Sequence, residues 1–232
     1  MPGAFWLRAG FDEAMAVSRR GWLERISSGR YVCARKSVSP QKHYRKSFII
    51  VLLAALGLAP AFAAEPAAAV IDNERVKVWD TTESIAAMAD DFVAIDFAKG
   101  AAVYGHAGET AGRAGVRTVI IDLKNHPVPP LANNSGYPNA YPRPHIDKLI
   151  ENERVIVWNY RWFLNDPTPM HFHDKDVVVV YLEDSPLQST EPNGKAVVNE
   201  YKSGDIRFNK RDRIHTELVV RGTASAVITE LK

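Results

Sequence analysis

Three histidines in the last third of the chain have a spacing that suits a metal ion. His171 and His173 are two residues apart, and His215 follows 42 residues after His173. Side chains two apart on a strand share one face, so His171 and His173 can present two imidazoles to the same ion. His215 precedes the apolar run 218–220, and a neighbouring strand can bring it in as a third ligand. The pattern predicts a divalent metal site.

The elements that must position these histidines read as strands. Residues 154–164 are β-branched and aromatic, while residues 177–182 and 224–231 are continuous apolar runs. Proline, glycine, asparagine and aspartate separate the runs, as in proteins built from many short strands. Only residues 81–90 indicate a short helix. The sequence therefore predicts an all-β barrel or sandwich.

An internal repeat indicates that this unit is built twice. Residues 73–80 and 152–159 are identical at six of eight positions, including a tryptophan. The closing segments of the two halves, 117–124 and 225–232, also resemble each other. Each half is thus expected to open and close with the same kind of strand.

The two segments that carry the histidines resemble the signature motifs of the cupin superfamily. Residues 168–185 resemble the first motif, G-x5-H-x-H-x3,4-E-x6-G. Residues 204–215 resemble the second, G-x5-P-x-G-x2-H-x3-N, because the eleven-residue step from Gly204 to His215 is kept. The resemblance implies double-stranded β-helix (jelly-roll) barrels in two tandem cupin-like domains. It also implies that the three histidines bind a divalent metal ion, which can be Fe, Mn, Zn or Ni.

The sequence departs from the cupin pattern at the fourth ligand. The motif's glutamate falls on Val177 or Val178, neither of which can bind a metal. Glu217 shares a strand face with His215 and can take the place of the motif glutamate. Asp176 can do so only if a bulge turns it to the face of the histidines. The third alternative, which we expect, is an open position filled by water or substrate.

The two halves differ in what they can bind. We predict that residues 149–232 form the cupin domain with the metal site, and that residues 65–124 are a degenerate cupin-like half. The first half places His106 near the position of His215 but has no histidine pair. We therefore expect this half to have a structural role, burying the sheet that the second barrel would otherwise expose.

Residues 125–148 are predicted to connect the halves. This segment holds six of the chain's 14 prolines, which disfavour both helix and central strand. A semi-rigid linker is the expected structure. The alternative is a lid in which Tyr137, Tyr141 and Pro142 fold over a barrel mouth.

Residues 1–64 read as a leader with a secretory signal. A basic cluster at 42–46 precedes the uncharged segment 47–64, which ends in an A-x-A site at residues 61–63. We expect cleavage near Ala63 and a periplasmic or secreted mature protein. The alternative is an uncleaved anchor, which would be the chain's link to a membrane.

Composition supports this division and argues against nucleic-acid binding. The whole chain has a formal net charge of +2 and an isoelectric point near 8.6. Residues 1–64 hold 10 of the 29 basic and 3 of the 27 acidic residues, so the remainder is acidic. The single cysteine, Cys33, also lies in the leader, and no internal disulfide is possible.

The sequence leads to one principal function and one alternative. We expect an exported, cupin-type protein that binds a divalent metal and acts as a metal-dependent enzyme on a small oxygenated substrate. The alternative is a non-catalytic periplasmic bicupin that binds or senses a small ligand, with a homodimer as a further possibility. A basic run, Lys210, Arg211 and Arg213, either faces an anionic substrate or forms a solvated turn, and the turn is expected.

Overall fold

The computed structural model describes residues 68–232. The predictions for the leader and signal, residues 1–64, lie outside the described residues. Within the described range the chain consists of strands and turns, without an α-helix. No helix in this range is long and apolar enough to cross a membrane.

The short helix predicted at residues 81–90 is wrong. This segment instead lies against another loop, where the backbone N–H of Ile85 donates to the Ala111 carbonyl at 2.9 Å. Ile85 and Met88 pack into an apolar cluster on the sheet of the first half. The pairing with a distant loop outweighs a weak local helix preference.

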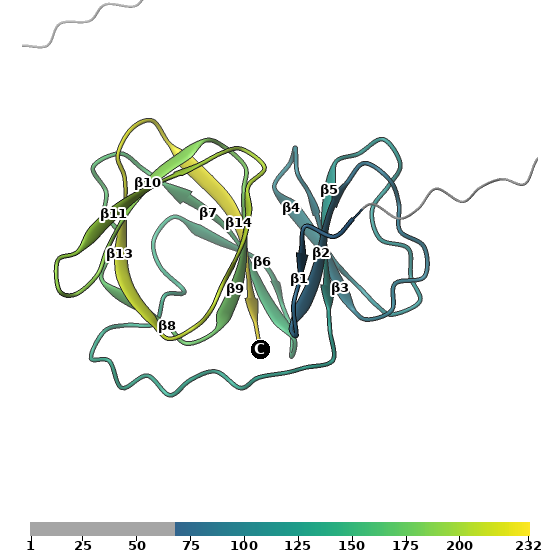
Figure 1. The fold of residues 1–232 in the computed structure, drawn as a ribbon, viewed down its shortest axis with the longest axis horizontal. Coiled ribbons are helices and arrows are strands. Elements are labelled where there is room, and N and C mark those ends of the chain that lie inside the picture. The colour runs from purple at the N-terminus through teal and green to yellow at the C-terminus, as the bar shows by residue number, and fades with distance from the viewer. Residues whose placement is uncertain (1–67) are drawn as a thin grey trace, which may run out of the picture. The chain divides into compact units, whose positions relative to one another are not determined.

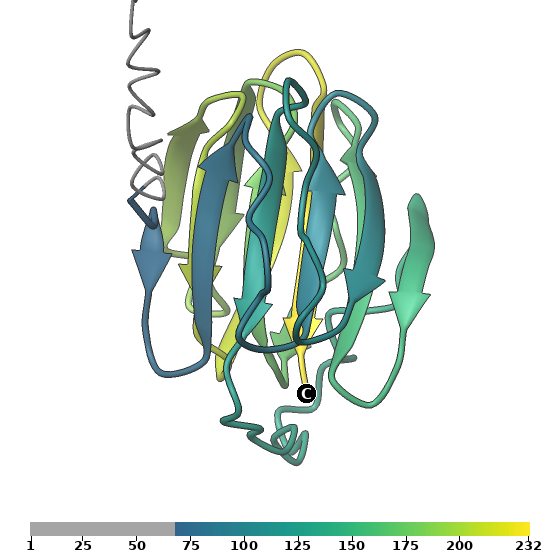
Figure 2. The ribbon, with the colours of Figure 1, turned by 90° about the vertical axis from the view of Figure 1, so that its right-hand side faces the viewer.

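The first half forms a single antiparallel sheet with strand order β1-β2-β5-β3-β4, which faces the viewer in Figure 2. Its strands are β1 (Ile71–Asp72), β2 (Val76–Thr81), β3 (Phe92–Asp96), β4 (Ala101–Gly105) and β5 (Thr118–Leu123). Two ladders join consecutive strands, β1 with β2 and β3 with β4, whereas β5 comes last in this half and lies between β2 and β3, pairing with both.

The second half forms two antiparallel sheets that enclose a barrel (Figure 1). One sheet has the order β12-β9-β14-β7-β6 and the other has the order β11-β10-β13-β8. The strands are β6 (Ile146–Glu151), β7 (Val155–Trp162), β8 (His171–His173), β9 (Asp176–Tyr181), β10 (Ser185–Thr190), β11 (Ala196–Tyr201), β12 (Ile206–Asn209), β13 (Arg213–Val219) and β14 (Ala224–Leu231). The predicted all-β fold is confirmed, and the second half forms the predicted double-stranded β-helix barrel, whereas the first half is a single sheet.

Two central strands of the sheet β12-β9-β14-β7-β6, β9 and β14, are buried on both faces. In β9, Val178 and Val180 pack against the first-half sheet, while Val177, Val179 and Tyr181 point into the barrel. Because side chains alternate along a strand, a strand buried on both faces reads as a continuous apolar run. The first half therefore covers the outer face of the barrel, as its predicted structural role requires.

The repeated sequence corresponds to repeated structure. Asn73 and Asn152 occupy equivalent turns, and each side-chain oxygen accepts hydrogen bonds from the backbone N–H groups two and three residues later. The arginines of the repeat then cross between the halves. Arg75 donates to the carbonyl of the chain's last residue at 3.2 Å, and Arg154 donates to the carbonyl at the end of β5 at 2.8 Å.

Candidate metal centre

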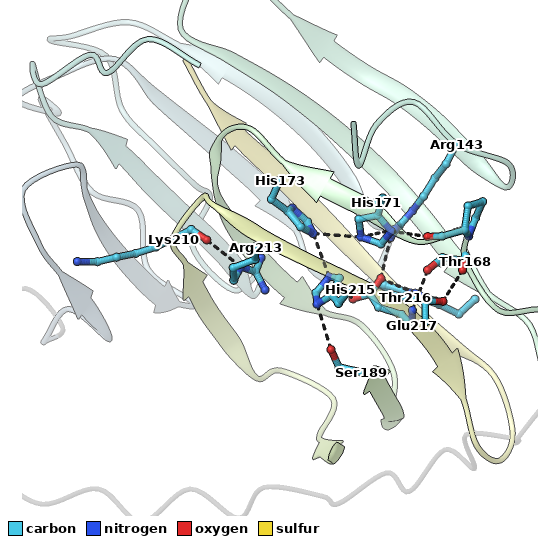
Figure 3. A network of polar contacts seen from close by, with 12 residues as sticks. Arg143, Thr168, His171, His173, Ser189, Lys210, Arg213, His215, Thr216 and Glu217 are labelled. Atoms are coloured by element: carbon cyan, nitrogen blue, oxygen red, sulfur yellow. Dashed lines mark hydrogen bonds and ion pairs between the residues drawn. The ribbon is translucent and has the colours of Figure 1, made fainter. Parts of the chain in front are cut away.

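Two neighbouring strands bring the three predicted histidines together. β8 carries His171 and His173, and β13 pairs with it antiparallel. His215 lies opposite His171 in this ladder, and Arg213 lies opposite His173. Residues that face each other across a ladder share one sheet face. These four side chains therefore lie together on the inner face of the sheet (Figure 3).

The imidazole nitrogens converge closely enough to share one ion. His173 Nε2 lies 3.2 Å from His171 Nε2 and 3.1 Å from His215 Nε2. Metal–imidazole bonds are about 2.1 Å long, so two nitrogens on one ion are separated by about 3.0 Å at a right angle and about 3.4 Å in a tetrahedron. The observed spacing falls between these values. The three residues present fit a single divalent ion.

The three rings are buried, and burial holds them in the neutral form that binds metals. Their exposed fractions are 2% for His171, 4% for His173 and 9% for His215. Burial lowers the pKa of His171 to about 4. Burial, with the nearby charge of Arg213, holds the pKa of His173 well below its usual range, and burial also lowers the pKa of His215. Neutral imidazole offers a lone pair to an ion at neutral pH.

Neighbouring groups orient two of the rings. His171 Nδ1 lies 2.8 Å from the Pro169 carbonyl oxygen, which can only accept. The proton of neutral His171 is therefore on Nδ1, and the Nε2 lone pair points to the other histidines. His215 Nδ1 lies 3.0 Å from Ser189 Oγ, which is a suitable acceptor for the same tautomer.

A carboxylate lies at the edge of the histidine cluster. Glu217 follows His215 on the same face of β13, and its Oε1 lies 3.9 Å from His215 Nε2. Its Oε2 accepts hydrogen bonds from Arg143 at 3.0 Å and from Trp162 Nε1 at 3.1 Å. Burial opposes ionisation, but the charge of Arg143 and those of the three nearby histidines together outweigh it and hold the pKa of Glu217 well below its usual range. Glu217 is ionised and within reach of the site.

His171 and His173 of the first motif and His215 of the second therefore meet on adjacent strands inside a jelly-roll barrel. This half of the chain has a cupin fold. No protein-family model and no curated protein matches the chain.

Solved structures with a similar fold include proteins that are named as cupins. A cupin domain from Bordetella pertussis Tohama I is 26% identical, with 43% of this chain and 99% of that chain covered and a TM-score of 0.36. A cupin 2 conserved barrel domain protein from Leptotrichia buccalis is 10% identical, with 71% and 87% covered and a TM-score of 0.45. The polyketide cyclase RemF from Streptomyces resistomycificus is 16% identical, with 45% and 80% covered and a TM-score of 0.32.

Arg143 is a site residue that the sequence reasoning missed. It comes from the proline-rich segment and its side chain is 5% exposed. Its NH1 lies 3.3 Å from His171 Nε2, and its guanidinium stacks over the ring of Tyr160 at 4.1 Å. Its position between two prolines, which restrict the backbone on both sides, was the one available signal.

The proline-rich segment is more than a connector. Tyr141 lines the cavity of the cupin barrel beside the histidines, as the lid alternative expects. Tyr137 and Pro142 are exposed and take no part. The end of the segment also enters β6, which begins at Ile146. Prolines exclude regular structure, but they leave the side chains between them free to pack.

Two other candidate residues lie away from the histidines. Asp176 points to the opposite face of β9, where its carboxylate pairs with Arg75 at 2.6 Å and accepts from the Arg211 backbone at 2.9 Å. No bulge brings it to the inner face of β9, because its ladder is regular. His106 has a side chain that is 70% exposed and lies beside Asp91 at 3.4 Å.

The cupin barrel encloses a cavity of about 120 Å³ next to the histidines. Val177, at the position of the motif glutamate, lines it, so no carboxylate enters from β9. The walls combine aliphatic, aromatic and polar side chains, which are Tyr141, Trp162, His173, Val177, Val179, Tyr181, Leu187, Ser189, Asn199, Tyr201, Asn209, Arg213, His215, Glu217 and Ile228. The cavity can therefore orient a small molecule by both shape and hydrogen bonds.

Proposed function

We propose that this protein binds one divalent metal ion through His171, His173 and His215 and acts as a metal-dependent enzyme on a small oxygenated substrate. One observation carries the proposal. Three buried, neutral imidazoles converge beside a cavity, and His173 Nε2 lies within 3.2 Å of the Nε2 atoms of the other two. When bound, the ion would supply a Lewis acid or a site for dioxygen. The donor set of three imidazoles is compatible with Fe, Mn, Zn or Ni.

The chain's own residues define what the site can do. Glu217 places a negative charge beside the histidines, and this charge favours a cation there. Its low pKa makes it a weak base, and Arg143 holds it in place. The substrate must therefore be held mainly by the ion and by the polar cavity wall.

The pairing of Glu217 favours the alternative function, a non-catalytic protein that binds or senses a small ligand. Of the residues that line the cavity within 68–232, Glu217 is the one carboxylate, and it is held by Arg143 and Trp162. A barrel with a metal ion but without a free general base is also suited to binding or sensing a small ligand. Turnover of a substrate by the metal-loaded protein separates the two functions.

Export remains a proposal that depends on the sequence alone. The basic cluster, the uncharged segment and the A-x-A site at residues 61–63 support it. Mass spectrometry of the protein recovered from the periplasm or medium should find a chain that begins near residue 64. An exported chain that still carries Met1 would contradict cleavage.

Elemental analysis tests the metal site directly. The purified protein should contain about one equivalent of a divalent metal, and the double variant His171→Ala/His173→Ala should contain none. The matched control is His106→Ala/His145→Ala, since both of these histidines have exposed side chains. Metal that is absent from the parent protein, or that remains in the first variant, would overturn the proposal.

A further inference from the structure

We propose that the ligand of this cavity is a small carboxylate anion, and that Arg213 binds its carboxylate next to the metal ion. The inference rests on the proposed metal site and names the class of its substrate. It departs from the sequence analysis, in which the basic run around Arg213 was expected to form a solvated turn.

The ladder between β8 and β13 places Arg213 at the site. Arg213 lies directly opposite His173 and on the same inner face of β13 as His215. Its Nε donates to the Lys210 carbonyl at 2.8 Å, which orients the guanidinium (Figure 3). Among residues 68–232 its two terminal nitrogens have no hydrogen-bond partner and no ion pair. An arginine fork next to a metal site suits a carboxylate, which it can bind through two parallel hydrogen bonds.

The balance of charge also calls for an anion. Apart from histidine, the charged residues that line the cavity are Arg213 and Glu217. Glu217 and Arg143, whose guanidinium lies 3.0 Å away, form a pair without net charge. Arg213 and a divalent ion would therefore leave the site with a net positive charge. Positive charges in a partly desolvated site favour an anionic ligand strongly.

Two uncharged amides complete the polar part of the wall. Asn199, on β11, and Asn209, at the end of β12, both line the cavity. Asn209 lies opposite Val177, the position at which the cupin motif has its glutamate. The neutral amide of Asn209 can donate to a carboxylate oxygen of the ligand. A glutamate at position 177 would repel that carboxylate. The loss of the motif glutamate thus fits an anionic ligand.

The size of the cavity limits the ligand. Its volume is about 120 Å³, and an apolar cavity of about 150 Å³ holds one benzene molecule. A ligand of at most about five non-hydrogen atoms therefore fits. The apolar wall of Val179, Leu187 and Ile228 leaves room for a short aliphatic body behind the carboxylate.

Calorimetric titration of the metal-loaded, full-length protein tests the inference. The probes are acetate and glycolate, each compared with its neutral amide of the same size, acetamide or glycolamide. The parent protein should bind each carboxylate more tightly than the matching amide. In Arg213→Gln this carboxylate-to-amide ratio should fall by about tenfold or more, because a charge-assisted pair is lost, and Arg213→Lys should restore part of it. Benzoate, which is too large for the cavity, should not compete with acetate.

The control is Lys210→Gln, which removes an exposed neighbouring charge and should leave the ratio unchanged. Metal content is measured for every variant, so loss of the ion is seen separately from loss of the ligand. A protein that takes up no metal overturns the proposed function and this inference together. A metal-loaded protein in which Arg213→Gln keeps the parent ratio, or in which Lys210→Gln lowers it equally, overturns this inference alone.

Discussion

Glu217 and Arg143 form an ion pair of 3.0 Å at the edge of the histidine cluster, although they come from parts of the chain 74 residues apart. The pair sets the charge of the site. It keeps a carboxylate ionised close to His215, and it places a guanidinium where it contacts His171.

Replacing Glu217 by glutamine tests what its charge does for the ion. The amide keeps the shape but removes the negative charge near His215 Nε2. We expect affinity for a divalent metal to fall by about 10- to 100-fold, as for partners outside the ligand set in other metal sites. Competition with a chelator of known affinity measures the effect. An unchanged dissociation constant would show that Glu217 acts only as the partner of Arg143.

Replacing Arg143 by methionine tests the other half of the pair. The metal-free variant should lose about 3 to 5 kcal/mol of unfolding free energy, because a buried carboxylate is left without its cation. Added metal should recover part of that loss, since the ion brings a positive charge near Glu217. Urea unfolding with and without metal gives both values. The control Arg161→Met removes an exposed arginine whose ion-pair distance is 3.9 Å, and it should cost less than about 1 kcal/mol.

Restoring the motif glutamate should strengthen the site. Val177 lines the cavity, whereas Val178 points into the apolar layer between the halves. We expect Val177→Glu to lower the melting temperature of the metal-free protein and to tighten metal binding by about tenfold, or about 1.4 kcal/mol. Val178→Glu should destabilise the protein with and without metal alike. Equal rescue of both variants by metal would contradict the assigned faces of β9.

The ion pair between Arg75 and Asp176 should stabilise the contact between the two halves. The atoms lie 2.6 Å apart, and the side chains are 5% and 11% exposed. Arg75→Met should cost about 3 to 5 kcal/mol of unfolding free energy, because it leaves a buried carboxylate unpaired. Lys99 forms an exposed ion pair with Asp96, three residues earlier in the chain. Lys99→Met should lower the free energy of unfolding by about 1 kcal/mol or less. Metal content should stay at the parent value in both, and its loss in Arg75→Met would contradict the separation of Asp176 from the metal site.

Much of the site follows from local spacing. A strand turns alternate side chains to the same face, so the spacing of His171 and His173 placed both on one wall before any fold was known. The same parity placed Glu217 with His215 and turned Asp176 away, as the structure shows. The repeat at residues 73–80 and 152–159 likewise predicted the same kind of strand in each half, and the structure has β2 and β7 there, each preceded by an asparagine turn.

What the sequence by itself determined is therefore the all-β class, several of the strands, and the spacing that puts His171 and His173 on one strand face. Only the tertiary structure decided that Arg143 and Tyr141 enter the barrel, that Glu217 is ionised and paired, and that Arg213 faces the cavity. The proline-rich segment has no periodicity from which its inward side chains could be predicted. The charge state of a buried carboxylate depends on neighbours that lie far away in sequence, and folding alone brings those neighbours together.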